Sequence, residues 1–311
     1  MEKITTVGLD LAKQVMSVHA VDGDGRMVTR KLLRREQLLR WTATLPECIV
    51  AMEACGGAHY WARELRRQGH TVRIIAAEFV QAFRKSGKND ANDAEAICTA
   101  ARQPNMRFVA VKSVEQQAAL CVHRLRQGVT EERTAMINRL RGLLTEFGVV
   151  APLSPEKLRR ELARCQDPDD PRLPATERQL VADEVTALDQ LDVRLAGYAE
   201  KVAAQADESE VAQRLQAIAG VGPTTAAAMV ASVGAPQDFR NGRQFAAWLG
   251  LTPRQHSTGG KTRLGRITKR GDAYLRTLLI LGAKSALQAA LRKPPEARHR
   301  LTPKVVATVA A

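Results

Sequence analysis

Apolar residues in the first third of the chain recur at two alternating spacings, which predicts strands interleaved with helices. Alternating or short apolar runs predict strands at residues 4–11, 15–21, 27–33, 48–52, 72–76 and 107–111. Helical spacing predicts helices at residues 35–45, 59–68, 78–84 and 91–102. The turn sequence Asp22-Gly-Asp-Gly25 predicts a hairpin between the second and third strands. This element order predicts a mixed sheet with helices on its faces.

The middle of the chain has the apolar spacing of long helices. One helix is expected over residues 113–150, where Pro152 and Pro155 then interrupt the chain. A break rich in Pro and Asp follows at 167–174, and a second long helix begins near Thr176. In that helix a heptad pattern is formed by Val181, Leu188, Leu195 and Val202. The pattern fits a coiled-coil contact with a second copy and a helical hairpin within one subunit equally well.

Residues 211–311 are expected to be mainly helical. Gly220 and Gly222 interrupt the helical pattern of residues 215–229, and Pro223 suits the start of a helix. This arrangement resembles the helix-hairpin-helix motif, in which hairpin amides and a helix N-terminus bind a DNA phosphate. A plain helical turn has the same pattern. Further helices are expected at 239–249 and 272–291.

The stretch between these last helices, residues 252–271, combines hydroxyl groups, glycines and cations. Ser257 and Thr258 precede Gly259 and Gly260, which permit φ > 0 and a close approach of the backbone to a ligand. Cations bind phosphate oxygens. The residues expected to contact nucleic acid, besides the glycines at 220 and 222, are Arg254, Thr258, Gly259, Gly260, Lys261, Arg263, Arg266, Lys269 and Arg270. The alternative interpretation is a solvated basic loop.

Charge is distributed unevenly. The 311 residues include 47 Lys and Arg against 33 Asp and Glu, a net charge of +14. Residues 240–311 carry 15 cations against two acids, whereas residues 154–210 carry 14 acids against eight cations. A local basic excess predicts a polyanionic partner, here double-stranded DNA.

The cysteines and apolar runs exclude several classes of protein. The five cysteines form no Cys-x-x-Cys pair, which argues against a disulfide framework or a zinc site. The chain has no signal-peptide core and no apolar run of membrane-spanning length. We therefore expect a cytoplasmic protein that does not bind a membrane.

Four carboxylates stand where metal ligands are expected. Asp10 and Glu53 lie at the ends of predicted strands, and Asp90 and Asp93 are three residues apart on one helical face. Such oxygen ligands suit Mg²⁺ or Mn²⁺. A pair of these ions can activate an attacking oxygen and stabilise a leaving one in phosphodiester chemistry. Taken singly, each acid has a plainer interpretation, as a turn former or, for Asp90, as a helix cap.

Four segments together resemble the bacterial insertion-sequence transposases of the DEDD type: residues 8–13, 52–57, 88–95 and 250–271. They occur in the family's order and span nearly the whole chain. The resemblance implies an RNase H-like, RuvC-like mixed-sheet domain at 1–112. It also implies a helical coiled-coil linker at 113–210 and a serine-bearing domain, mainly helical, at 211–311. The predicted fold class is therefore α/β plus α.

The resemblance also implies a chemistry. Asp10, Glu53, Asp90 and Asp93 would form a RuvC-like metal site, and Ser257 best matches the family's catalytic serine, with Thr258 as its neighbour. In this family the serine is thought to attack DNA as a phosphoserine link, and a bridge RNA selects the element ends and the target. A homo-oligomer, dimer or tetramer, would bring one subunit's acids to another's serine.

Two alternative functions remain open at this point. No His–Asp partner is evident beside Ser257, so a metal would have to activate the hydroxyl, and a stored phosphoserine ester suits rejoining without ATP. In the first alternative, a RuvC-like endonuclease or Holliday junction resolvase, water attacks and the serine only contacts phosphate. The second is an inactive nucleic-acid-binding remnant. It is prompted by residues 292–311, a Pro- and Arg-rich end where similar proteins continue with a further helix.

Overall fold

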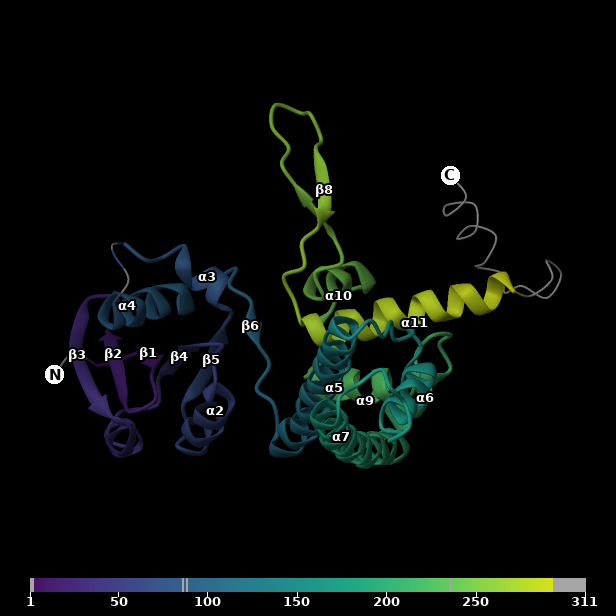
Figure 1. Ribbon diagram of the computed structural model, residues 1–311. Coiled ribbons are helices and arrows are strands. Elements are labelled where there is room, and N and C mark those ends of the chain that lie inside the picture. Colours follow the sequence, from purple (N-terminus) through teal and green to yellow (C-terminus); the bar gives the residue numbers. More distant parts are fainter. Residues whose placement is uncertain (1–2, 86, 88, 235, 293–311) are drawn as a thin grey trace. The chain divides into compact units, whose positions relative to one another are not determined.

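The computed structural model describes residues 3–85, 87, 89–234 and 236–292 (Figure 1). They fall into two compact units that divide after Ser113. The expected further division of the second unit at residue 210 stays a prediction. Residues 293–311, which hold most of the unusual C-terminal end, lie outside the described residues.

The first unit is built on a six-stranded mixed sheet with the order β3-β2-β1-β4-β5-β6. The strands are β1 (Thr6–Leu11), β2 (Val15–Val21), β3 (Met27–Arg34), β4 (Ile49–Glu53), β5 (Thr71–Ile75) and β6 (Phe108–Val109). The first three strands are antiparallel, β1, β4 and β5 are parallel, and β6 is antiparallel to β5. This sheet is compatible with the expected RNase H-like fold.

Helices cover both faces of this sheet (Figure 1). They are η1 (Arg35–Gln37), α1 (Leu38–Thr42), α2 (Ala58–Arg67), α3 (Ala77–Gln81) and α4 (Asp90–Ala101). On the α2 face, Leu9, Met16 and Trp61 belong to one buried cluster. On the α4 face, Ala51 and Ile97 belong to another. Because side chains alternate along a strand, residues two apart from Ala51 face α4 as well.

The distance between α4 and β1 depends on Gly8. A Cβ atom at this position would lie 2.2 Å from the carbonyl oxygen of Ala94 and 2.6 Å from the backbone nitrogen of Cys98. Any side chain here would push α4 off the sheet. Gly8 therefore allows the helix that bears Asp90 and Asp93 to pack directly on the strand that bears Asp10.

Two long helices dominate the second unit, α5 (Val114–Glu146) and α7 (Ala175–Asp207), as the spacing predicted. The connecting break contains a helix that the sequence did not predict, α6 (Pro155–Cys165). Of the heptad residues, Val181 and Leu188 are buried with α5 and α6 side chains of the same chain. This packing is that of a helical hairpin within one subunit.

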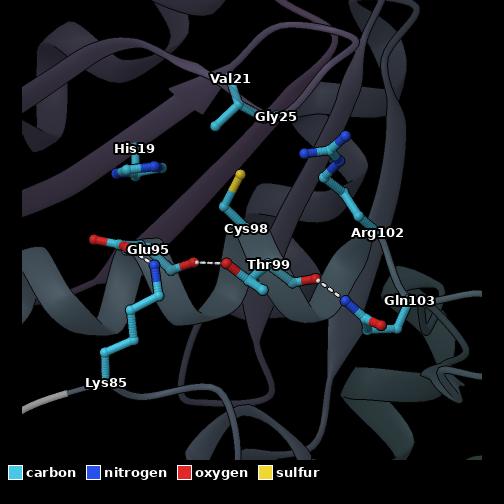
Figure 2. Close-up of a pocket in the computed structure, with 9 residues that line it drawn as sticks. All are labelled: His19, Val21, Gly25, Lys85, Glu95, Cys98, Thr99, Arg102 and Gln103. Carbon is cyan, nitrogen blue, oxygen red and sulfur yellow. Dashed lines mark hydrogen bonds and ion pairs between the residues drawn. The ribbon is translucent and has the colours of Figure 1, made fainter.

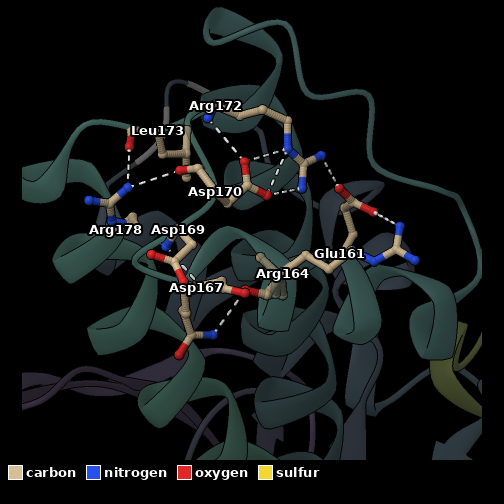
Figure 3. Close-up of polar contacts among 10 residues, drawn as sticks. Glu161, Arg164, Asp167, Asp169, Asp170, Arg172, Leu173 and Arg178 are labelled. Atoms are coloured by element: carbon tan, nitrogen blue, oxygen red, sulfur yellow. Dashed lines mark hydrogen bonds and ion pairs between the residues drawn. The ribbon is translucent and has the colours of Figure 1, made fainter.

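The acidic break before α7 is held by arginines (Figure 3). The guanidinium of Arg172 binds Asp170, with Nε 2.8 Å from Oδ1, and also contacts Glu161. This guanidinium lowers the pKa of the Asp170 carboxyl to about 2. Arg178 donates to the carbonyl oxygens of Asp170 and Leu173. Part of the acidic excess of residues 154–210 therefore stabilises a turn.

The rest of the second unit is helical apart from one hairpin. Its helices are α8 (Glu210–Gln216), α9 (Pro223–Ser232), η2 (Pro236–Asp238), α10 (Gly242–Trp248) and α11 (Ala273–Leu291). The stretch expected to be a loop forms a two-stranded hairpin, β7 (Pro253–Gln255) and β8 (Leu264–Ile267), that extends away from the helices (Figure 1). Across the described ranges, no helix has both the length and the apolar character needed to span a membrane.

We predict that Gly8→Ala lowers the free energy of unfolding by about 1–3 kcal/mol, because the new methyl group overpacks the β1–α4 contact. Gly23→Ala is the matched control, since a Cβ there meets no atom within 4 Å. Its expected effect is within about 0.5 kcal/mol. Urea denaturation followed by circular dichroism measures both, and equal effects would contradict the role given to Gly8.

Candidate active-site residues

Asp10 and Glu53 are brought to neighbouring strand ends. β1 and β4 are parallel with Leu9 opposite Met52, so the two acids follow that pair directly. Both are half-buried and lie on the α4 face of the sheet. The thiol of Cys55 has its pKa raised by desolvation first and then by the negative charges of Glu53 and Asp10. The two carboxylates therefore lie near one another.

Asp90 and Asp93 lie in the first turn of α4. The helix cap is Asn89, whose side-chain oxygen accepts from the backbone nitrogen of Asn92 at 2.8 Å, so the alternative role of Asp90 as a cap is wrong. Asp90 is exposed, whereas Asp93 is 6% exposed. The Asp93 carboxylate accepts from Arg84 Nε at 2.6 Å. A guanidinium thus supplies positive charge beside Asp93.

These carboxylates have the donor chemistry of a hydrated Mg²⁺ or Mn²⁺ site. Among the described residues, however, no group of three or more His, Cys, Asp or Glu side chains is arranged to hold a metal ion. Ser17, opposite Asp10 in the β1–β2 register, has a buried hydroxyl with no hydrogen-bond partner in the described chain. Such a group suits a water molecule of an ion's hydration shell. The chemical types of these side chains therefore suit a divalent ion.

Ser257 lies in the β7–β8 hairpin, just before its tip. The tip is a tight turn in which Gly259 (φ 54°) and Gly260 (φ 76°) are left-handed and Lys261 N donates to Thr258 O at 3.0 Å. Two consecutive residues with positive φ make it a type I′ turn. The two glycines thus adopt the positive φ that the sequence permits.

The Ser257 hydroxyl is oriented by its own hairpin. Its oxygen accepts from Gln255 Nε2 at 2.9 Å and from Arg263 N at 3.1 Å. Neither donor is a base, so the hairpin orients the hydroxyl without deprotonating it. Both donors stabilise negative charge that develops on this oxygen.

The cations expected to contact nucleic acid are all exposed on or beside this hairpin: Arg254, Lys261, Arg263, Arg266, Lys269 and Arg270. The base of the hairpin is fixed to the end of α10. A Cβ on Gly250 would lie 2.5 Å from Arg270 N, and one on Gly271 would lie 2.0 Å from the carbonyl oxygen of Trp248. The cations are therefore carried on or beside a projecting β-hairpin whose base is closely packed.

Gly220 and Gly222, in the segment that resembles a helix-hairpin-helix motif, have different surroundings. Gly220 (φ 87°) packs against α11, where its Cβ would lie 2.5 Å from Gly282 O. Gly222 is exposed, and Pro223 begins α9 as predicted. Gly220 therefore has a packing role, and Gly222 is the more accessible of the pair.

Sequence reasoning missed the groups that act on the candidate site residues. Arg84 pairs with Asp93 across nine positions. Ser257 accepts hydrogen bonds from Gln255, the last residue of β7, and from Arg263, the residue before β8. No spacing rule marks these partners, because they depend on tertiary packing and strand register.

Comparisons with known proteins match both units. Residues 212–300 match the family described as "Transposase IS116/IS110/IS902 family", and residues 7–149 match the DEDD transposase model of IS110, described as "Transposase". The chain is 49% identical over 298 residues to a "Probable family 20 transposase" of Pseudomonas aeruginosa, covering 96% of this chain and 88% of that protein. It is 39% identical to the transposase for element IS1328 of Yersinia enterocolitica (93% and 85% covered). It is 38% identical to that for IS1111A of Coxiella burnetii (93% and 79% covered).

We predict that Arg84→Gln lowers the free energy of unfolding by about 1–3 kcal/mol, because it leaves the buried Asp93 carboxylate without its charged partner. Adding Asp93→Asn should recover much of that loss, since the remaining pair is neutral. Arg67→Gln is the control, because its pair with Glu64 lies on an exposed helix surface and is worth little. Chemical denaturation measures these three and the Asp93→Asn single variant. A double-variant loss equal to the sum of the two single losses would contradict the coupling.

Proposed function

Because this chain belongs to the IS116/IS110/IS902 family of transposases and is a DNA transposase, we propose that Ser257 is its nucleophile and that Asp10, Glu53, Asp90 and Asp93 form its metal site. The hydrogen bonding of Ser257 is the observation that carries the proposal. Two donors hold its oxygen beside a glycine turn surrounded by exposed cations.

The serine step exchanges one phosphate ester bond for another, so no bond energy is lost to hydrolysis. Ser257 Oγ attacks a DNA phosphorus, the bond from phosphorus to the leaving deoxyribose oxygen breaks, and that oxygen takes up the proton. A hydroxyl of the strand to be joined then attacks the phosphoserine and returns a proton to Ser257. Gln255 and Arg263 stabilise charge on Oγ during both displacements. This reversibility suits a recombinase.

The carboxylates have a separate role in the proposal. A bound Mg²⁺ or Mn²⁺ supplies positive charge that activates an attacking oxygen and stabilises a leaving one. Asp10 and Glu53 lie at the ends of adjacent strands. Asp93 becomes available as a metal ligand when its ion pair with Arg84 breaks. The family is divalent-metal dependent, which supports this assignment. The choice between the two ions belongs to the proposal.

DNA contact is assigned to the hairpin and to the glycine turn. Each exposed cation that neutralises a phosphate releases counterions, so affinity falls steeply with salt. The residues assigned are Gly220, Gly222, Arg254, Thr258, Gly259, Gly260, Lys261, Arg263, Arg266, Lys269 and Arg270. Of these, Gly222 has open space above its backbone. These residues contact the DNA phosphate backbone and do not recognise the base sequence.

We extend the proposal to a bridge RNA that selects the DNA and to a dimer or tetramer that shares the site between subunits. The family resemblance supports both. Sharing is further supported by the location of the parts, since the carboxylates and Ser257 belong to different units of the chain.

We predict that Ser257→Ala lowers strand transfer by roughly a thousandfold or more, because no covalent intermediate can form. Thr258→Ala is the matched control. It removes one assigned DNA contact but should still form the covalent intermediate. The direct measurement is a protein–DNA adduct resolved on a denaturing gel with labelled element-end DNA. An adduct formed by Ser257→Ala would assign the nucleophile to another residue. Cleavage by the wild type without any adduct would favour attack by water and an endonuclease mechanism.

Asp10→Asn should abolish cleavage while DNA binding persists, because the amide removes a charged metal ligand and leaves the basic hairpin intact. Cleavage assays with added Mg²⁺ or Mn²⁺, paired with gel-shift binding, separate the two effects. Undiminished cleavage in Asp10→Asn would contradict the metal assignment.

A further inference from the structure

A cavity of about 320 Å³ lies on the α4 face of the first unit and is lined by none of the four candidate metal ligands (Figure 2). It opens between β2 with its following turn and the second half of α4. Its polar lining includes His19, Lys85, Glu95, Thr99, Arg102 and Gln103. Figure 2 shows His19 near one end and Arg102 near the other, with Cys98 and Thr99 between them. Ligand pockets begin at about 300 Å³, so the space admits a phosphate with its attached sugar.

Arg102 is fixed in this cavity by the turn after β2. Its Nη2 donates to the carbonyl oxygen of Gly23 at 2.9 Å. Gly25 has φ 87°, and a Cβ there would lie 2.0 Å from Arg102 Nη1. The turn thus has a glycine where the guanidinium passes. A positive group held in place before the ligand arrives binds an anion at low entropic cost.

The acid of the cavity is already matched by cations. Lys85 Nζ lies 2.8 Å from Glu95 Oε1, and Arg30 Nη2 lies 2.9 Å from Glu95 Oε2. One carboxylate thus faces two cations, and Arg102 adds a third. The lining keeps a positive excess, which favours an anionic ligand.

His19 shows that a hydrogen-bonding partner is missing. Its side chain is buried, with the residue 6% exposed, and its Nδ1 has no hydrogen-bond partner within the described chain. Leaving such a group unpaired is unfavourable. Burial lowers the pKa of His19, Arg30 and Lys85 lower it further, and Glu95 opposes them. The neutral ring can donate from one nitrogen and accept at the other.

We propose that this cavity binds a phosphate of the DNA strand on which the transposase acts, with His19, Lys85 and Arg102 contacting its oxygens. DNA is the favoured source because it is the substrate of this enzyme family. Neither Ser257 nor the metal site enters the argument, so this site can fail while the proposed chemistry holds.

The test follows the side-chain ¹H–¹⁵N signals of the histidines, of which the full-length chain has six. His19 is assigned by its loss in His19→Gln. The probes are inorganic phosphate, the deoxy dinucleotide dTpdT and its ribo counterpart rUpU. We expect dTpdT to shift the His19 signals saturably and to raise the pKa of His19, because a bound anion favours the imidazolium.

Arg102→Gln should weaken dTpdT binding by about tenfold to a hundredfold, since a charged hydrogen bond is lost. Gly25→Ala should weaken it too, with no change in charge, by displacing the guanidinium. Arg67→Gln, an exposed arginine on α2, is the control and should bind as the wild type does. Thermal melting of each variant confirms folding.

Four outcomes would overturn the proposal. In the first two, the His19 signals respond to none of the probes, or respond equally in wild type and Arg102→Gln. A response to inorganic phosphate alone would indicate a free-ion site, and a response to rUpU alone would assign the cavity to RNA.

Discussion

The contact between Gly8 of β1 and the backbone of α4 is the constraint on which the first unit depends. It allows the helix to approach the strand at backbone distance. Gly8 lies two residues before Asp10, and it faces the backbone of Ala94, the residue after Asp93. Every acid on that face takes its position from this packing. The cavity beside His19 depends on it as well, since its walls are β2 and the same helix.

The carboxylates on this face of the sheet also differ in the ion pairs that they form. Asp93 is paired with Arg84, and Glu95 with Lys85 and Arg30, so two neighbouring carboxylates on α4 are neutralised by the protein itself. Asp10 and Glu53 lie at the ends of adjacent parallel strands. A divalent ion bound at the proposed site would compete with Arg84 for Asp93. That competition would link the local structure of the segment before α4 to metal binding.

Much of the fold was predictable, because it rests on local rules. Strand alternation located Asp10 and Glu53, and helical spacing located α5 and α7. α6 was missed because its eleven residues lie between proline-rich breaks. Its apolar side chains are buried only by packing against α5 and α7. β7 and β8 were missed because these strands have only three and four residues, of which all but the half-buried Ile267 are exposed, so neither has a buried apolar face. The partners of Ser257 and Asp93 follow from register and packing, which no local pattern encodes.

The β7–β8 hairpin carries its cations without any acid between residues 252 and 271. Two such hairpins repel one another, and the repulsion extends about 10 Å at 0.1 M salt. A polyanion placed between them removes this barrier and replaces it with attraction. In the oligomer proposed above, charge would therefore favour an order of assembly in which nucleic acid binds first and a second hairpin approaches afterwards.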